Sequence, residues 1–309
     1  MRFSTPSVLA LATVAAARPS MVKKQATMEV TDADILQYAL TLEHLENNFY
    51  KQAVSKWDEK AFTDAGFSAM FYNDLKTITH DEEGHVVYLE AGLTAAGASP
   101  VQACNYTFPM TDPKSFVAFA SVVEGLGVSA YLGAAGLITT KAYLTAAGSI
   151  LVTEALHQAT QRGAIGEVPS ANVFGTPLGL NAVYSIASAY ISECPSSNAA
   201  LPVMAYPELA VASGMPSAPG ALVDLFPGMM PNGACFATFV SGLDIVPVKP
   251  VAVLDGMIQA IVPPMVSGQS YIFLTSDDSG NLTDSNILAG PAIVEVTPNA
   301  PTFNLTITK

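Results

Sequence analysis

Two stretches with the same pattern decide the fold: Glu82-Glu83-Gly84-His85 and Glu154-Ala155-Leu156-His157. Each places a glutamate three residues before a histidine, and two of the chain's four histidines have such a partner. Both stretches lie in segments whose apolar residues recur at helical spacing, and positions i and i+3 share one face of a helix. One carboxylate and one imidazole on each helix can therefore bind the same metal ion. The ion would offset the cost of burying the glutamate.

The spacing of apolar residues around these stretches predicts four long helices. The first begins near Thr31, an N-cap candidate followed by an acidic first turn. The other three are predicted over 71–96, 114–137 and 142–163, with a short fifth helix over 181–192.

A site for two metal ions in a helical bundle needs one more glutamate from each of two further helices. Glu43 in the first helix and Glu124 in the third supply them. Two alternatives remain for the first helix: Glu46 points inward in place of Glu43, or both glutamates face water. Tyr50 and Tyr131 each follow seven residues, or two helical turns, after their glutamate. The chain thus reads as two tandem helix pairs, each with Glu…Tyr followed by Glu-x-x-His.

The two tyrosines are candidates for supplying an electron or a proton beside the metal ions. The alternative is that they are ordinary core residues with a satisfied hydroxyl. His44 and His80 lack the glutamate partner and are predicted to be surface or supporting residues rather than ligands.

Composition excludes several classes of protein. The chain has 309 residues with 50% hydrophobic and 13% charged residues and a formal net charge of −13. A disordered chain would need the reverse composition, and a nucleic-acid-binding protein would need a basic surface. No nucleic acid is expected as a partner.

The N-terminus predicts export. Residues 1–17 have a basic start, an uncharged apolar run and small residues at the end, which is typical of a signal peptide. Three glycosylation sequons, at Asn105, Asn281 and Asn304, fit a secreted glycoprotein of the extracellular space or cell wall. The apolar stretch 116–156 is interrupted by charges, and no transmembrane segment is expected in the mature chain.

The sequence changes character near residue 195. Prolines become frequent, and strands are predicted over 271–275, 292–297 and 302–308, which favours a small β-sandwich-like domain. The domain prediction is a signal peptide at 1–17, a bundle at 30–165, a fifth helix and linker at 166–200 and a β-rich domain at 201–309. Three cysteines, Cys104, Cys194 and Cys235, allow one disulfide in any of three pairings.

The segments 39–50, 79–85, 121–131 and 149–162 resemble the ferritin-like superfamily. Within it they are similar to secreted ferritin-like proteins of fungi associated with stress response and sexual development, and more distantly to plant desiccation-related proteins. The resemblance covers about residues 30–195 and implies a mainly α, ferritin-like four-helix bundle. It implies six metal ligands, with Glu82 and Glu154 bridging: Glu43, Glu82, His85, Glu124, Glu154 and His157. A leader, sequons and a β region are foreign to cage-forming ferritins, so an iron-storage shell is not expected.

The expected cofactor is a pair of Fe ions, with Mn as the alternative because the ligands are mostly hard oxygens. The expected partners are metal ions and O₂ or peroxide, with ferroxidase-like oxidation of Fe(II) or oxidant scavenging as the activity if the protein is an enzyme. The alternative is a structural or protective extracellular protein that kept the bundle without catalysis. The sequence makes no prediction of the substrate or of the oligomeric state.

Overall fold

The computed structural model describes residues 30–212, 218–302 and 306. The chain divides into two compact units, one of residues up to 169 together with 176–206, the other of 170–175 and 207 onward. The predicted signal peptide at 1–17, the Asn304 sequon and most of the predicted strand 302–308 lie outside the described residues. The second unit begins after Tyr206 rather than at residue 201, and it also takes in part of the predicted linker.

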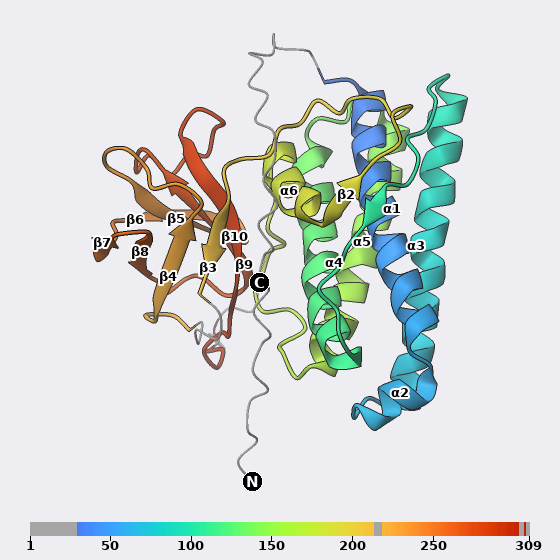
Figure 1. The fold of residues 1–309 in the computed structure, drawn as a ribbon, viewed down its shortest axis with the longest axis horizontal. Coiled ribbons are helices and arrows are strands. Elements are labelled where there is room, and N and C mark those ends of the chain that lie inside the picture. The colour runs from blue at the N-terminus through green and yellow to red at the C-terminus, as the bar shows by residue number, and fades with distance from the viewer. Residues whose placement is uncertain (1–29, 213–217, 303–305, 307–309) are drawn as a thin grey trace. The chain divides into compact units, whose positions relative to one another are not determined.

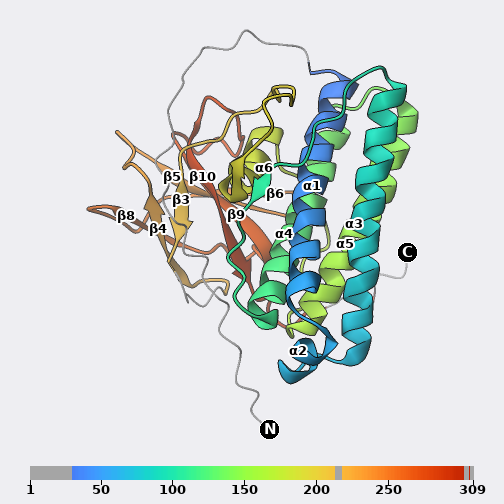
Figure 2. The same ribbon diagram turned by 45° about the vertical axis from the view of Figure 1, so that its right-hand side comes forward.

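The first unit is a bundle of four long helices, α1 (Asp32–Lys56), α3 (Ala69–Ala95), α4 (Pro113–Ala135) and α5 (Lys141–Ala164). Helix α1 pairs with α3 and α4 with α5, and the two pairs pack side by side (Figures 1 and 2). The predicted four-helix architecture is confirmed. A short helix that the apolar pattern did not predict, α2 (Glu59–Asp64), lies in the turn between α1 and α3.

Side-chain caps fix the starts of three of these helices, and at α3 the Ser68 hydroxyl accepts from the Phe71 amide. Thr31 caps α1 as predicted, since its hydroxyl accepts from the Asp34 amide and the Asp34 carboxylate accepts from the Thr31 amide. Asp112 and Ser115 make the same reciprocal pair at the start of α4, where Pro113 occupies the first turn. Helix α1 buries the predicted stripe, which consists of Ile35, Tyr38, Leu42, Leu45 and Phe49.

Among the described residues, α4 is the one helix long and apolar enough to cross a membrane. Its most apolar 18-residue window has a mean hydropathy of 1.5, but 78% of that window is buried inside the protein. Phe116, Val117 and Ala120 are completely buried. Packing at the centre of a bundle therefore accounts for its composition.

A small disulfide-linked structure completes the first unit. Helix α6 (Leu180–Ala187) continues as a 3₁₀ turn (Ser188–Tyr190) and then as strand β2 (Ile191–Glu193), which pairs with β1 (Asn105–Tyr106). The predicted fifth helix is therefore shorter, because its last residues pair with β1. Cys104 and Cys194 form a disulfide next to this pair, while Cys235 is a half-buried free thiol whose pKa is raised by burial.

The second unit is a β structure of two four-stranded antiparallel sheets. One has the order β10-β9-β5-β6 and the other β3-β4-β8-β7. The strand bounds are β3 Leu209–Val211, β4 Leu222–Pro227, β5 Phe236–Ser241, β6 Asp244–Val248, β7 Ala252–Leu254, β8 Met257–Ile261, β9 Gly268–Thr275 and β10 Ile287–Val296. Val223 and Leu225 from one sheet share a core with Phe239 and Ile272 from the other. The predicted β-rich C-terminal region is confirmed, and its two sheets share one core as in a sandwich.

The segment 170–175 adds to this second unit although it lies between α5 and α6 in the chain. Asn172 donates a hydrogen bond to Ser241 Oγ at 3.2 Å, and Ala171 packs so closely on Gly268 that a Cβ there would lie 2.8 Å away. Gly268 has φ +68°, which favours glycine. Glycine therefore satisfies both the backbone conformation and the close approach.

Candidate metal centre

The structure brings all six predicted ligand residues together in the interior of the bundle. Glu43 lies on α1, Glu82 and His85 on α3, Glu124 on α4, and Glu154 and His157 on α5. The four glutamates are completely buried, and the two histidines are nearly so. Each helix turns the polar residues of its inner stripe toward the bundle axis, where four carboxylates meet two imidazoles.

One group of four side chains converges on His85. Its Nδ1 atom lies 3.2 Å from Glu43 Oε2 and 3.6 Å from Glu82 Oε2. The same nitrogen lies 3.5 Å from Glu154 Oε1. One ligand atom from each of the four residues lies within 4.8 Å of the others, which is the spacing of a site for one cation.

A second group converges on His157. Its Nδ1 atom lies 3.0 Å from Glu82 Oε1 and 3.3 Å from Glu124 Oε2. Glu154 completes this group, so Glu82 and Glu154 belong to both. The two imidazole rings are 6.3 Å apart between centroids and lie 30° from parallel. Two overlapping ligand sets with two shared carboxylates have the arrangement of a two-metal site.

Whether these residues fit a pair of metal ions can be tested by asking which of their buried polar atoms have hydrogen-bond partners. Among the described residues, several buried atoms of the cluster have no hydrogen-bond partner: both oxygens of Glu82, both oxygens of Glu154, Glu124 Oε2 and His157 Nδ1. Imidazole nitrogens lie 3.0–3.6 Å from several of these oxygens, but buried carboxylate oxygens that accept no hydrogen bond are expensive. Their convergence on common points, with nitrogen and oxygen donors, fits cations bound between them.

The charge of the cluster favours bound positive charge of any kind. Burial lowers the pKa of His85, but the neighbouring Glu43 and Glu82 outweigh it and raise that pKa to about 10. In the same way Glu124 and Glu82 raise the pKa of His157 to about 11. Burial and the surrounding carboxylates also raise the pKa of Glu154 well above its ordinary value. Protons and metal ions therefore compete for the same donor atoms.

Two tyrosines cross-link the helix pairs at the cluster. The Tyr50 hydroxyl donates to Glu124, and the Tyr131 hydroxyl donates to Glu43. Each tyrosine therefore holds the glutamate of the other half of the chain rather than the one seven residues before it. Gln161 in turn donates to the Tyr50 oxygen at 3.1 Å. These contacts leave each terminal carboxylate with one fixed oxygen and one oriented toward the ligand set.

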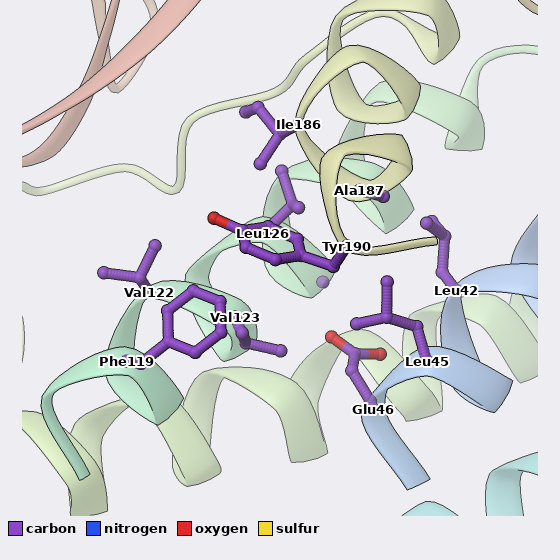
Figure 3. Close-up of a pocket in the computed structure, with 11 residues that line it drawn as sticks. Leu42, Leu45, Glu46, Phe119, Val122, Val123, Leu126, Ile186, Ala187 and Tyr190 are labelled. Atoms are coloured by element: carbon purple, nitrogen blue, oxygen red, sulfur yellow. The ribbon is translucent and has the colours of Figure 1, made fainter. Parts of the chain in front are cut away.

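Gly127 on α4 makes room for the carboxylates. A Cβ at this position would lie 2.1 Å from Glu154 Oε2 and 3.0 Å from Glu46 Oε1. Glu46, three residues after Glu43, is also buried, so the structure buries both first-helix glutamates rather than one. Burial raises the pKa of Glu46 well above its ordinary value, and the nearby carboxylates raise it further. Figure 3 shows its carboxyl group facing a small apolar pocket between α1, α4 and the α6 segment.

The remaining histidines lie outside both ligand sets. His44 is buried, but its Nε2 atom lies 3.0 Å from the Val101 carbonyl. His80 is exposed on α3. The sequence analysis did not identify Asp81, whose carboxylate lies 3.3 Å from His157 Nε2. It also did not identify Gln161, although its place four residues after His157 on the same face was a usable signal.

Comparison with known proteins agrees with this arrangement. Residues 31–167 match the family model described as "Ferritin-like domain", a segment that contains all four long helices and all six candidate ligands. A curated protein with 24% identity over 182 residues is Protein rds1 of Schizosaccharomyces pombe. The match covers 59% of this chain and 44% of that protein, so this chain spans less than half the length of that relative.

Proposed function

We propose that this chain is an exported di-metal carboxylate protein that holds two Fe ions, with Mn as the alternative metal. The observation that carries the proposal is the pair of overlapping four-residue ligand sets with unpartnered buried carboxylate oxygens. Glu82 and Glu154, which belong to both ligand sets, would be shared by the two ions. Glu43 with His85 would hold one ion, and Glu124 with His157 would hold the other.

The residues of this chain prepare the site in three ways. The tyrosines fix the terminal glutamates through crossed hydrogen bonds. Asp81 orients the His157 ring from its far nitrogen, a carboxylate–histidine arrangement that strengthens metal ligation. The apolar surroundings keep bulk water away, which strengthens the interaction of the carboxylates with a cation.

The proposed activity depends on iron, which can change its oxidation state. When bound, two Fe(II) ions supply two electrons for the reduction of O₂ or peroxide, which is iron oxidation or oxidant scavenging. Burial raises the pKa of Tyr50 and of Tyr131 well above 10, so both hydroxyls keep their protons at neutral pH and serve as hydrogen-bond donors. Their role as sources of an electron or proton belongs to this proposal. A role in stress response, taken from the resemblance to fungal proteins, also belongs to it.

Export is supported by the predicted signal peptide and by two of the sequons. Asn105 and Asn281 are both exposed, so glycans attached there would not disturb either core. The Cys104–Cys194 disulfide is of the kind that persists in oxidising compartments. We therefore place the mature protein outside the cell or in the cell wall.

Metal content tests the proposal. The mature protein, reconstituted anaerobically with Fe(II) or Mn(II), is expected to bind two ions, and Glu82→Ala/His85→Ala is expected to lose both because Glu82 is shared. The matched control is His80→Ala/Glu83→Ala, which removes the same residue types from exposed positions of the same helix. Absence of bound metal in the unmutated protein would refute the proposal. Stoichiometric metal without oxidation of Fe(II) by O₂ or peroxide would favour the structural, protective alternative.

A further inference from the structure

Helix α5 presents a regular, uncharged face to the surface of the bundle. Its inner stripe is buried and includes Glu154 and His157, which belong to the candidate metal centre. On the opposite face, residues recur at alternating intervals of three and four, which is the spacing of a coiled-coil seam. Five of these outer residues are exposed, and the last is half-buried. They form the α5 seam, which consists of Ala142, Thr145, Ser149, Val152, Leu156 and Ala159.

The α5 seam carries no charge, although the chain has a formal net charge of −13. Over residues 142–161 the only acidic and basic side chains are Glu154 and His157, and both are buried on the inner face. A surface helix normally places charged and polar side chains on its outer face. Two copies of an acidic chain repel each other where their carboxylates meet, and at the seam they meet without this repulsion. The seam also offers no carboxylate to a basic partner.

The seam is large enough for a specific contact between two copies. Val152 and Leu156 are 59% and 63% exposed. Asp81, whose carboxylate contacts His157, marks the edge of α3 toward α5 (Figure 2), and further along this edge Tyr88 is 55% exposed. The seam is about 26 Å long, and a face of two helices is about 20 Å wide. Two such faces bury about 1,000 Å² in total, which is the lower end of the range for specific interfaces.

The order of large and small side chains in the seam suits pairing with a second copy of itself. In an antiparallel pair of α5 helices whose twofold axis crosses the seam at its midpoint, Leu156 faces Thr145 of the second copy. In the same pair Val152 faces Ser149 of the second copy. Each large side chain therefore meets a smaller one, which is the arrangement that interdigitated packing needs. A parallel pair would instead set Leu156 against Leu156 and Val152 against Val152.

We propose that the protein forms a dimer in which α5 of one copy packs antiparallel on α5 of a second copy through the α5 seam. The interface is isologous, because the same face serves both copies. The Thr145 hydroxyl donates to the Lys141 carbonyl of its own helix at 3.0 Å, so it enters the interface with its hydrogen bond made. Ser149 can donate in the same way to the carbonyl four residues before it. The seam contains no candidate metal ligand, so pairing does not depend on bound metal.

Sedimentation equilibrium of the mature protein tests the proposal, both metal-free and after reconstitution. We expect a reversible dimer between about 1 and about 100 μM, the range suited to an interface of this size. Val152→Glu places an unpaired charge in the seam and should weaken dimerisation at least about tenfold. The matched control is Val87→Glu, at an α3 position with the same 59% exposure. Val87 lies one turn after Glu83, which pairs with Lys51 of α1, so it faces away from the seam and its substitution should leave the dissociation constant unchanged.

A cysteine pair tests the antiparallel register in a Cys235→Ser background, which removes the free thiol. Thr145→Cys/Leu156→Cys should form a covalent dimer under mild oxidation, because the two positions face each other across the axis. Leu156→Cys alone should stay non-covalent, since its two copies lie about 16 Å apart along the helix pair, beyond the reach of a disulfide.

The cysteine variants decide the proposal even if Val152→Glu does not fold. A monomer at about 100 μM, an equal effect of the two glutamate variants, or equal cross-linking by Leu156→Cys alone would overturn it. A dimer that binds no metal would support the α5 interface and count against the proposed function alone.

Discussion

Replacing Gly127 by alanine should weaken metal binding while leaving the stability of the helical bundle nearly unchanged. The new Cβ would lie 2.1 Å from Glu154 Oε2, and Cβ contacts shorter than 3.0 Å essentially do not occur, so the shared carboxylate must move by at least about 0.9 Å. A displacement of this size at an oriented ligand is large, since supporting-residue changes alone cost about 10–100-fold in metal affinity. We expect Gly127→Ala to bind metal at least about tenfold more weakly.

The effect on the fold should be small by comparison. Alanine in a helix interior is favoured over glycine by about 1 kcal/mol, and overpacking costs about 1–3 kcal/mol. The metal-free variant should therefore lose no more than about 2 kcal/mol. Gly148→Ala on α5 is the matched control, because a Cβ there meets nothing within 4 Å. It should keep full metal binding and gain slightly in stability.

The assay is metal content and affinity after reconstitution, together with urea unfolding of the metal-free proteins followed by circular dichroism. Weak metal binding at near-normal stability in Gly127→Ala alone supports the geometry. Wild-type metal affinity in Gly127→Ala would contradict the position of Glu154, and an equal loss in Gly148→Ala would show that helix packing rather than the carboxylate is responsible.

Three further outcomes are expected. Tyr50→Phe removes the donor to Glu124 Oε1 and the acceptor of the Gln161 amide, so it should lower the unfolding free energy of the metal-free protein by about 1–3 kcal/mol. An unchanged denaturant midpoint would contradict it. The pKa values of the two ligand histidines are raised to about 10 and 11, so their protonation stabilises the metal-free fold fully below about pH 6.5, and this contribution is lost as the pH rises toward 10. Metal uptake at pH 7 should then release protons and strengthen with pH, which calorimetry in buffers of different ionisation enthalpy measures; uptake without proton release would refute it. Reducing the Cys104–Cys194 disulfide, which spans 90 residues, should lower stability by up to about 4–5 kcal/mol in the chain-entropy account, seen as a lower urea midpoint with reductant, and an unchanged midpoint would count against it.

The helical half was predictable because its signals are periodic and long. The stripe from Ile35 to Phe49 and the Glu-x-x-His pairs specify both the helices and their inward faces. Which glutamates of the first helix are buried in the bundle was harder to predict from the sequence. The sequence analysis treated Glu43 and Glu46 as alternatives for the interior, whereas the absence of a side chain at Gly127, distant in sequence, makes room for Glu46 as well.

The β half was predicted in class but not in detail. The longest strands, β9 and β10, contain the predicted runs 271–275 and most of 292–297. Strands such as β3 and β7 have three residues each and gain their conformation from neighbours rather than from local pattern. The segment 170–175 joined the β unit for the same reason, since a single amide contact from Asn172 carries no periodic signal.

The two halves of the internal repeat correspond approximately, but they differ at two positions beside the metal ligands. Where the first half has Glu46, the corresponding position of the second half is Gly127, and two glutamates facing each other there would collide. Asp81 supports His157, but the equivalent position before Glu154 is Thr153, so His85 lacks that carboxylate. Two ions bound in this chain would therefore differ in affinity and in redox potential. The pseudosymmetric frame therefore builds two unequal ligand sets, which in the proposed two-metal form would fill at different metal concentrations.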